Sequence, residues 1–196
     1  MSYNREDYYV LSPDVRFRKE AHRCIFYTID TFFYATDNLS IIHPDDVIFL
    51  LLFDGSRNFN DVDRDFSFLF DRDNVDSIKI LENLKPQLHD TTIIVKKETL
   101  TDEEIKIIAN RYDPRDFLIP RDQVFLNPRN LKLEAPLSVN FNVDTRCGFS
   151  CLYCYHPLSK IDGYISIQRL KSIFTEFKEM GIESVLLTGG GSNVTT

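Results

Sequence analysis

The sequence predicts an α+β N-terminal part followed by the beginning of an α/β part. In the first 90 residues, short apolar segments typical of strands come before three amphipathic segments typical of helices. From residue 137 the order becomes strand, loop, helix and strand, which is the order of a βαβ unit. Charge divides the chain as well: residues 1–90 hold ten Lys and Arg against seventeen Asp and Glu, whereas residues 91–196 hold thirteen of each.

The N-terminal part begins with strand-like segments separated by polar turns. Residues 8–11 and 15–18 flank a turn at Ser12, Pro13 and Asp14, which are residue types that favour turns. Residues 24–28 and 31–35 flank a short turn at Ile29 and Asp30. These segments predict small strands at the start of the domain.

Three short helices are predicted to follow the strands. Pro44, Asp45 and Asp46 favour a helix start, and that helix continues through the apolar residues 47–53 to a stop at residues 54–55. A second helix is expected from residue 60 or 61 and a third from about residue 76, each with one apolar face. Strands followed by three helices form a winged-helix-like arrangement. Its predicted core contains Phe26, Ile48, Leu51, Phe66, Leu69, Ile78 and Leu81.

Between the two parts, residues 91–97 predict a strand and residues 102–109 predict a helix capped by Thr101. Prolines at positions 114, 120, 128 and 136 punctuate the segment that follows. We expect residues 111–135 to form an extended bridge that packs against the start of the second part. The predicted domains are therefore residues 1–110 and residues 136–196, joined by this bridge.

The second part has the pattern of one βαβ unit. Residues 137–143 alternate apolar and polar side chains, as in a half-buried strand. Ser166 is placed to cap a helix with an apolar stripe, and Gly181 suits the position just past its end. Residues 183–187 then predict a buried strand that leads into Gly189 and Gly190. Such a unit implies two parallel strands.

Three clustered cysteines are the strongest chemical signal in the chain. Cys147, Cys151 and Cys154 follow the pattern Cys-x3-Cys-x2-Cys, between the first predicted strand and the helix. Three thiolates at this spacing can hold three irons of a 4Fe–4S cluster and leave the fourth iron open. The remaining cysteine, Cys24, lies in an apolar stretch and is expected to be a small buried residue.

Two alternative uses of these cysteines are a zinc site and a disulfide framework. A zinc site normally needs a second cysteine pair, and this chain has none. His156 could supply a fourth zinc ligand, but a ligand two residues after Cys154 would strain a tetrahedral site. A disulfide framework conflicts with the odd number of clustered cysteines and with the lack of a secretion signal.

The cysteine spacing, with Tyr153 before the last cysteine, resembles the radical S-adenosylmethionine (radical SAM) enzymes. The resemblance implies a partial (β/α)6 barrel in which the open iron chelates the methionine part of S-adenosylmethionine. It also implies that Tyr153 lies beside the adenine, and that Gly189 and Gly190 lie near the methionine amino group. The family usually has Gly-Gly-Glu at this point, whereas Gly191 takes the place of the acid here.

Only about two barrel strands can be drawn after residue 134, whereas a barrel-type domain needs on the order of 200 residues. The chain is therefore expected to be C-terminally truncated, to end inside its catalytic domain and to be inactive alone.

Residues 42–59 carry a second resemblance, an apolar helix followed by Asp54, Gly55 and a short charged turn. They are similar to the PqqD-like domains that precede radical SAM peptide maturases. The resemblance implies that the leader of a ribosomally made precursor peptide adds as a strand to the third strand, beside the third helix. Carried over to this sequence, the peptide-binding residues are Thr31, Phe32, Phe33, Tyr34, Ile78, Leu81 and Lys85.

Together these resemblances predict a radical SAM enzyme that modifies a precursor peptide, with a 4Fe–4S cluster and S-adenosylmethionine as cofactors. Expected partners are the leader segment and a reductant protein such as a flavodoxin or ferredoxin, with no nucleic acid and no membrane. A cytoplasmic location is expected. The alternatives are a non-catalytic leader-binding protein and a winged-helix DNA-binding regulator. The acidic N-terminal part argues against DNA, whose binding depends on Lys and Arg.

Overall fold

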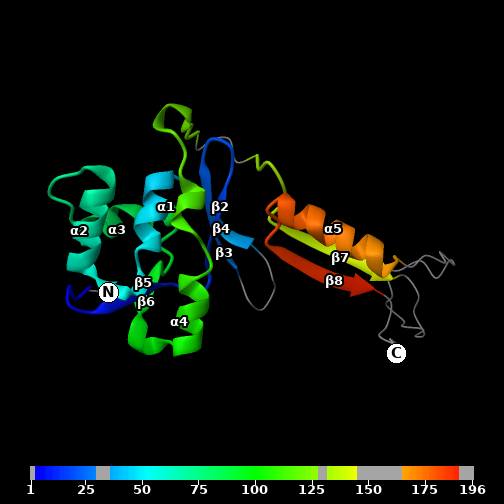
Figure 1. Cartoon of the computed structure of the whole chain (residues 1–196), viewed down its shortest axis with the longest axis horizontal. Coiled ribbons are helices and arrows are strands. Elements are labelled where there is room, and N and C mark those ends of the chain that lie inside the picture. Colours follow the sequence, from blue (N-terminus) through cyan, green and yellow to red (C-terminus); the bar gives the residue numbers. More distant parts are fainter. Residues whose placement is uncertain (1–2, 30–35, 128–131, 145–164, 190–196) are drawn as a thin grey trace. The chain divides into compact units, whose positions relative to one another are not determined.

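The computed structural model describes residues 3–29, 36–127, 132–144 and 165–189, which form an α+β structure of helices and small sheets (Figure 1). The chain divides into two units, Met1–Lys132 and Leu133–Thr196. This division falls well after residue 110, where the sequence placed the first boundary. Each unit is described by itself below.

The first unit contains two antiparallel three-stranded sheets. In one, β1 (Tyr8–Leu11) lies between β5 (Asp54–Asn58) and β6 (Ile94–Lys96). The other is a meander of β2 (Val15–Lys19), β3 (Cys24–Ile29) and β4 (Thr36–Ile42). The predicted strands at residues 8–11, 15–18 and 24–28 are confirmed. They do not share one sheet, because β1 pairs with β5 and β6 instead of β2.

A strand that the sequence did not predict follows β3. Residues 31–35, including Thr31, Phe32, Phe33 and Tyr34, lie outside the described residues. The partner of β3 is β4, which pairs from Thr36 opposite Ile29 to Ile42 opposite Cys24. Ile29 therefore belongs to a strand and not to a turn. Asp37 and Asn38 near the start of β4 have low strand propensity, which concealed this strand in the sequence.

Strand β5 was also missed, because Asp54 and Gly55 read as a helix stop. Gly55 has φ +84°, and a Cβ at this position would lie 3.0 Å from Cγ2 of Val10 and 3.3 Å from Cγ2 of Ile105. Glycine is therefore required both by the backbone conformation and by the close approach of β1 and the neighbouring helix.

The predicted helices are present with clear caps. Helix α1 (Pro44–Leu51) starts after His43, α2 (Phe59–Phe70) after Asn58, and α3 (Ser77–Leu84) after Asp76. In α2 the capping box is complete, since Asn58 and Asp61 each accept from the other's backbone amide. The same box at Thr101 starts α4 (Asp102–Ala109). The described residues of the unit also form the 3-10 turns η1 (Lys85–Leu88), η2 (Lys97–Thr99), η3 (Pro114–Phe117) and η4 (Arg121–Gln123).

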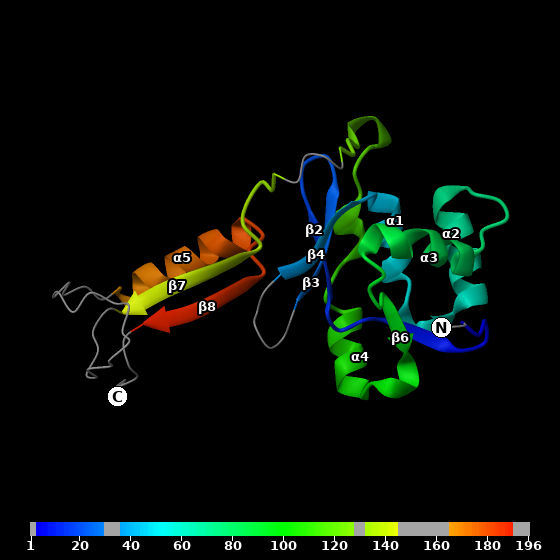
Figure 2. The ribbon, with the colours of Figure 1, turned by 180° about the vertical axis from the view of Figure 1, so that it is seen from behind.

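A cluster of aromatic rings forms the centre of the first unit. Phe49 and Phe53 of the α1 region contact Phe66 and Phe59 with ring centroids 5.1 and 5.3 Å apart, and Phe59 contacts Tyr9 of β1 at 5.1 Å. Helix α1 lies between the β2–β3–β4 sheet and the α2–α3 pair (Figures 1 and 2). One predicted core residue is wrong: Leu69 is 55% exposed, because Phe70 makes the contact to Phe66 instead.

The segment after α4 packs on the first unit. Phe117 is buried, and the Tyr112 hydroxyl accepts a hydrogen bond of 2.9 Å from the Phe17 amide. Farther along, the Phe125 amide donates to the His22 carbonyl, and Arg23 donates to the Lys132 carbonyl at 2.6 Å. The β2–β3 turn thus holds the chain as far as the end of the unit.

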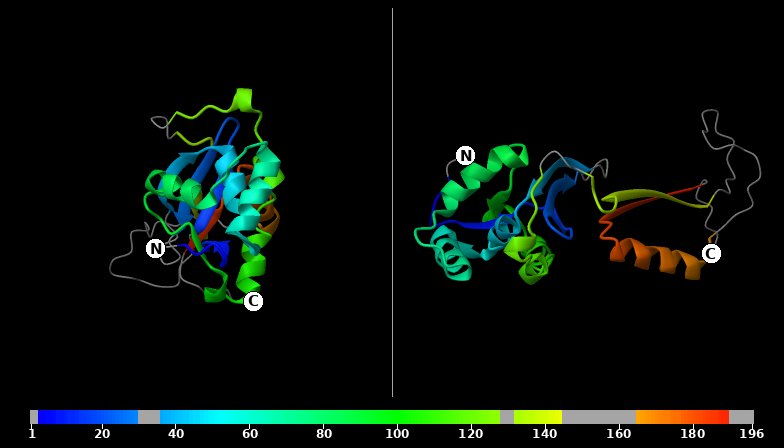
Figure 3. Two further views of the ribbon diagram at one scale, coloured as in Figure 1. Left: turned by 90° about the vertical axis from the view of Figure 1, so that its left-hand side faces the viewer. Right: turned by 90° about the horizontal axis from the view of Figure 1, so that it is seen from above.

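The second unit contains the predicted βαβ elements. Strands β7 (Ser138–Asp144) and β8 (Ser184–Gly189) pair in parallel, as predicted. Helix α5 (Ile167–Glu179) begins at Ser166, whose hydroxyl accepts from the Arg169 amide, and Gly181 follows it with φ +71°. The helix runs along one face of the strand pair (Figure 3), where Phe141 contacts Phe174 and Phe177.

A first prediction tests the aromatic core with two phenylalanines of one helix. Phe66 is 1% exposed and Phe68 is 86% exposed, although both lie in α2. Phe66→Ala should lower the free energy of unfolding by about 3–5 kcal/mol, because it removes buried ring contacts and leaves a cavity. Phe68→Ala should change it by less than ~0.5 kcal/mol. Urea denaturation measures both, and equal effects would contradict the packing.

A second prediction concerns Cys24, which is fully buried as expected from the sequence. Burial raises the pKa of its thiol to about 12. The neutral thiol therefore supports folding below the unfolded-state pKa, and this contribution is lost as the pH rises towards 12. At pH 8 the reactive thiolate is a fraction on the order of 10⁻⁴. Iodoacetamide should label Cys24 only in denaturant, as read by mass spectrometry. Rapid labelling of the folded chain would contradict its burial.

Candidate functional site

The carboxyl ends of β7 and β8 meet at one edge of the second unit. Asp144 is the last residue of β7 and is paired with Gly189, the last residue of β8. The chain segment that carries the three cysteines begins directly after Asp144, and Gly190 follows directly after Gly189. In α/β sheets, ligands bind at the carboxyl ends of parallel strands. The structure therefore brings Asp144, after which the cysteine segment begins, and Gly189 to the same edge.

Most of the predicted cluster and cofactor residues lie outside the described residues. This applies to Cys147, Cys151, Tyr153, Cys154 and Gly190. Gly189 is described as the end of β8. The structure thus describes Asp144, the residue directly before the cysteine segment. The positions of the three thiols remain a prediction.

The two faces of the β7–β8 pair differ in chemistry. Phe141 faces α5, and its register partner Leu187 lies on the same side. Because side chains alternate along a strand, the opposite face carries Asn140 of β7 and Thr188 of β8. The Thr188 hydroxyl donates to the Asn140 side-chain oxygen at 2.9 Å. The remaining residues of that face are Ser138, Asn142, Ser184 and Leu186. This mostly polar face can offer hydroxyl and amide groups to a polar ligand near the cysteine segment.

In the first unit, the two outer edges of the β2–β3–β4 sheet differ in the partners of their backbone groups. The outer edge of β2 is satisfied by side chains: Phe17 donates to the Tyr112 hydroxyl, and Arg111 donates to the Val15 carbonyl at 3.1 Å. Within the described ranges, no strand pairs with the outer edge of β4. An unpaired edge can accept an added strand, so β4 is the candidate edge for a peptide.

The predicted helix wall is only partly accessible. Leu81 is fully buried in the core, so as the structure stands it offers no surface to a peptide. Ile78 and Lys85 are half-buried, and the Lys85 ammonium lies 4.7 Å from the centre of the Tyr3 ring. The element that contacts β4 is η1 rather than α3, since the Ser40 hydroxyl donates to the Gln87 carbonyl at 2.8 Å.

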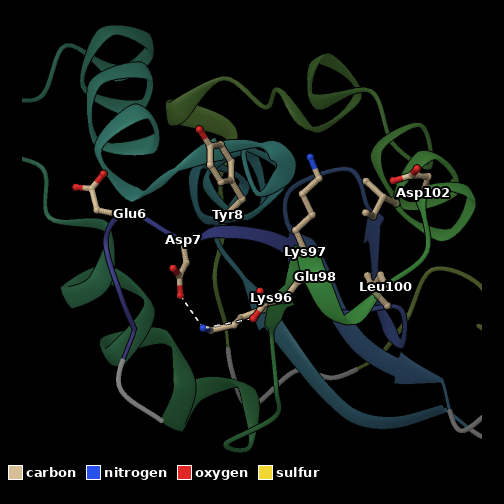
Figure 4. Close-up of a pocket in the computed structure, with 9 residues that line it drawn as sticks. Glu6, Asp7, Tyr8, Lys96, Lys97, Glu98, Leu100 and Asp102 are labelled. Atoms are coloured by element: carbon tan, nitrogen blue, oxygen red, sulfur yellow. Dashed lines mark ion pairs between the residues drawn. The ribbon is translucent and has the colours of Figure 1, made fainter.

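A cavity that the sequence did not indicate lies between β1, β6 and the start of α4 (Figure 4). Its volume is about 380 Å³. Asp7 and Lys96 form an ion pair of 2.7 Å there, and the Lys97 ammonium lies 5.8 Å from the centre of the half-exposed Tyr8 ring. Its residues come from two separate stretches of the chain, 6–8 and 96–105, and are mostly ordinary surface types. No sequence pattern could have found it.

Many arginines near the surface of the first unit are engaged with carboxylates. Arg5 bridges Asp63 and Asp76 at 2.7 and 2.6 Å, and thereby joins the N-terminal segment to α2 and to the start of α3. Arg57 pairs with Asp65 at 2.8 Å. Guanidinium groups held in such pairs must give up these partners before they can bind phosphates.

None of the helices within the described ranges has both the length and the apolar character required to cross a bilayer.

Comparison with known proteins identifies no relative of this chain. No family model matches it, and neither does any curated protein or solved structure. The features that indicate a function are the cysteine spacing, residues 42–59, and the geometry of the strands that flank the two candidate sites.

Proposed function

We propose that the chain contains the cluster-binding start of a radical SAM peptide maturase, joined to a domain that recognises the leader of a precursor peptide. The observation that carries the first half is the pairing of Asp144 with Gly189 at the carboxyl edge of β7–β8. In this pairing Asp144, which comes directly before the segment that carries the cysteines, lies opposite Gly189, the first glycine of the Gly-Gly pair. Both motifs are needed at one place if they serve one cofactor.

The donor set fits the cluster. Cys147, Cys151 and Cys154 would hold three irons, and the fourth iron would stay open for S-adenosylmethionine. When bound, the cluster supplies an electron, delivered by a flavodoxin or ferredoxin, for reductive cleavage of S-adenosylmethionine to the radical that attacks the peptide.

This chain's own residues would bind and orient the cofactor. The backbone at Gly189 and Gly190 can approach the methionine amino group closely, because neither residue has a side chain. Tyr153 would lie beside the adenine. The Asn140–Thr188 pair adds polar groups to the open face of the strands. Gly191 supplies no carboxylate, so the amino group would depend on backbone carbonyls alone.

The β4 edge supports the second half of the proposal. A leader peptide that adds as a strand gains backbone hydrogen bonds whatever its sequence, and side-chain contacts then provide specificity. The carboxylate pairing of Arg5 and Arg57 weighs against the alternative of a DNA-binding regulator. A non-catalytic leader-binding protein would use the same edge without the cluster.

The cluster is tested by iron content after anaerobic reconstitution. Cys147→Ala, Cys151→Ala and Cys154→Ala should each remove most of the bound iron, because two remaining thiolates cannot hold the cluster. Cys24→Ala is the matched control and should keep the iron of the parent, since Cys24 is buried in the other unit. One zinc per chain with no iron under any condition would refute the cluster and favour a zinc site.

Recognition is tested by titrating the full chain with peptides encoded beside its gene and with a DNA duplex. We expect a peptide to bind with little salt dependence, since backbone pairing provides much of the affinity. Binding to DNA should be negligible at physiological salt. DNA binding that weakens steeply with salt, together with no affinity for any peptide, would instead identify a regulator. Calorimetry measures both interactions.

A further inference from the structure

We infer that the His89 side chain occupies a backbone carbonyl on the outer edge of β4. A peptide that adds to this edge must therefore displace the His89 side chain. The inference deepens the proposed leader recognition and rests on it for the nature of the ligand. It does not depend on the iron–sulfur cluster. It names the residue that competes with the peptide and the backbone groups that the peptide takes over.

The direction of the β4 backbone shows which amide and carbonyl groups an added strand could bind. The His89 Nε2 atom lies 3.4 Å from the Leu39 carbonyl oxygen, where a protonated Nε2 donates to it. That carbonyl thus points away from β3. In an antiparallel strand the amide and carbonyl of one residue point the same way, and every second residue repeats this direction. The register is regular from Ser40 to Ile42, so the Ile41 amide and carbonyl also point outward.

The backbone that carries His89 is firmly held. His89 and Asp90 both have positive φ, +57° and +54°, and both amides donate to the Lys85 carbonyl. The preceding Leu88 is fully buried, which anchors the turn in the core. The Ser40–Gln87 hydrogen bond of 2.8 Å ties the same turn to β4. The turn can therefore stay in place while the exposed His89 ring moves.

The hydrogen bond between the His89 ring and the Leu39 carbonyl is weak. Its 3.4 Å contact is at the long end of hydrogen-bond distances and is exposed to water. An incoming strand can replace it with a backbone bond at Leu39 and gain further bonds at Ile41. His89 therefore reduces pairing by unspecific strands, as edge-protecting residues do, without preventing pairing by a peptide with suitable side chains.

A bulge at Asn38 limits the length of the β4 edge to which a strand can add. Asn38 has φ +55°, and the pairing with β3 is irregular at this point. Its side-chain amide donates to the Thr28 hydroxyl at 3.1 Å, which stabilises the irregular backbone. A bulge interrupts the regular alternation of amides and carbonyls. An added strand should therefore pair with Leu39 and Ile41 and end its regular pairing at Asn38.

The probe for this inference is a displayed library of short random peptides selected against the full chain. His89→Asn removes the ring but keeps a residue type that tolerates the left-handed backbone. Binders should gain about two- to tenfold in affinity for His89→Asn, the factor implied by the net worth of one exposed hydrogen bond. The matched control is His22→Ala, which removes another exposed ring that contacts a carbonyl, 3.2 Å away at Gln123. It should leave the affinity unchanged.

Hydrogen exchange gives a second readout that needs no further variant. Bound peptide should slow exchange at the Ile41 amide in both the parent and His89→Asn chains. Unchanged affinity for His89→Asn, or binding that leaves Ile41 exchange unaltered, would overturn the inference. A library that yields no binder to either chain would overturn it as well. Loss of iron in the cysteine variants has no bearing on these results, so failure of the cluster proposal can be told apart.

Discussion

The packing of aromatic rings around Phe59 is the interaction on which the first unit depends. Phe59 contacts Tyr9 of β1 and Phe53 at the end of α1, and Phe53 in turn contacts Phe49. These rings join the β5–β1–β6 sheet to the helices, and no pair of neighbouring segments could bury them alone. Because protein interiors are close-packed, their arrangement determines where each strand can lie. The position of η1 follows from the same core through the buried Leu88.

The packing of the chain around this core determines which outer edge of the β2–β3–β4 sheet is available for binding. The segment after α4 returns to cover β2, where Tyr112 and Arg111 satisfy outward backbone groups. Among the described residues, β4 is then the strand of the meander whose outer edge pairs with no other strand, and His89 lies against that edge. In the second unit, parallel strand pairing brings Asp144, which precedes the cysteine segment, and Gly189 to one edge of the sheet. Each candidate site is thus created by a sheet edge, lateral in one unit and carboxyl-terminal in the other.

The buried Glu20 carboxylate joins the side chains at the end of the β2–β3 hairpin. It accepts from Arg18 at 2.7 Å and from Arg23 at 2.8 Å, and the three side chains are almost excluded from water. Such a network is costly to break, because removal of one member leaves a buried charge without compensation. Arg23 also holds the Lys132 carbonyl, so the network secures the last described contact of the first unit.

Local signals were sufficient to predict the helices and the parallel strand pair. Caps such as Asn58, Asp76 and Ser166 act within one turn of their own helix, so residues close in sequence contain the needed information. The separate sheets of β1 and β2, the late strand β4, strand β5 and the exposure of Leu69 could not be predicted in this way. Those features depend on which distant segments compete for the same ring cluster and the same strand edge. Only the folded chain resolves that competition, because burial and strand pairing are properties of contacts between residues far apart in sequence.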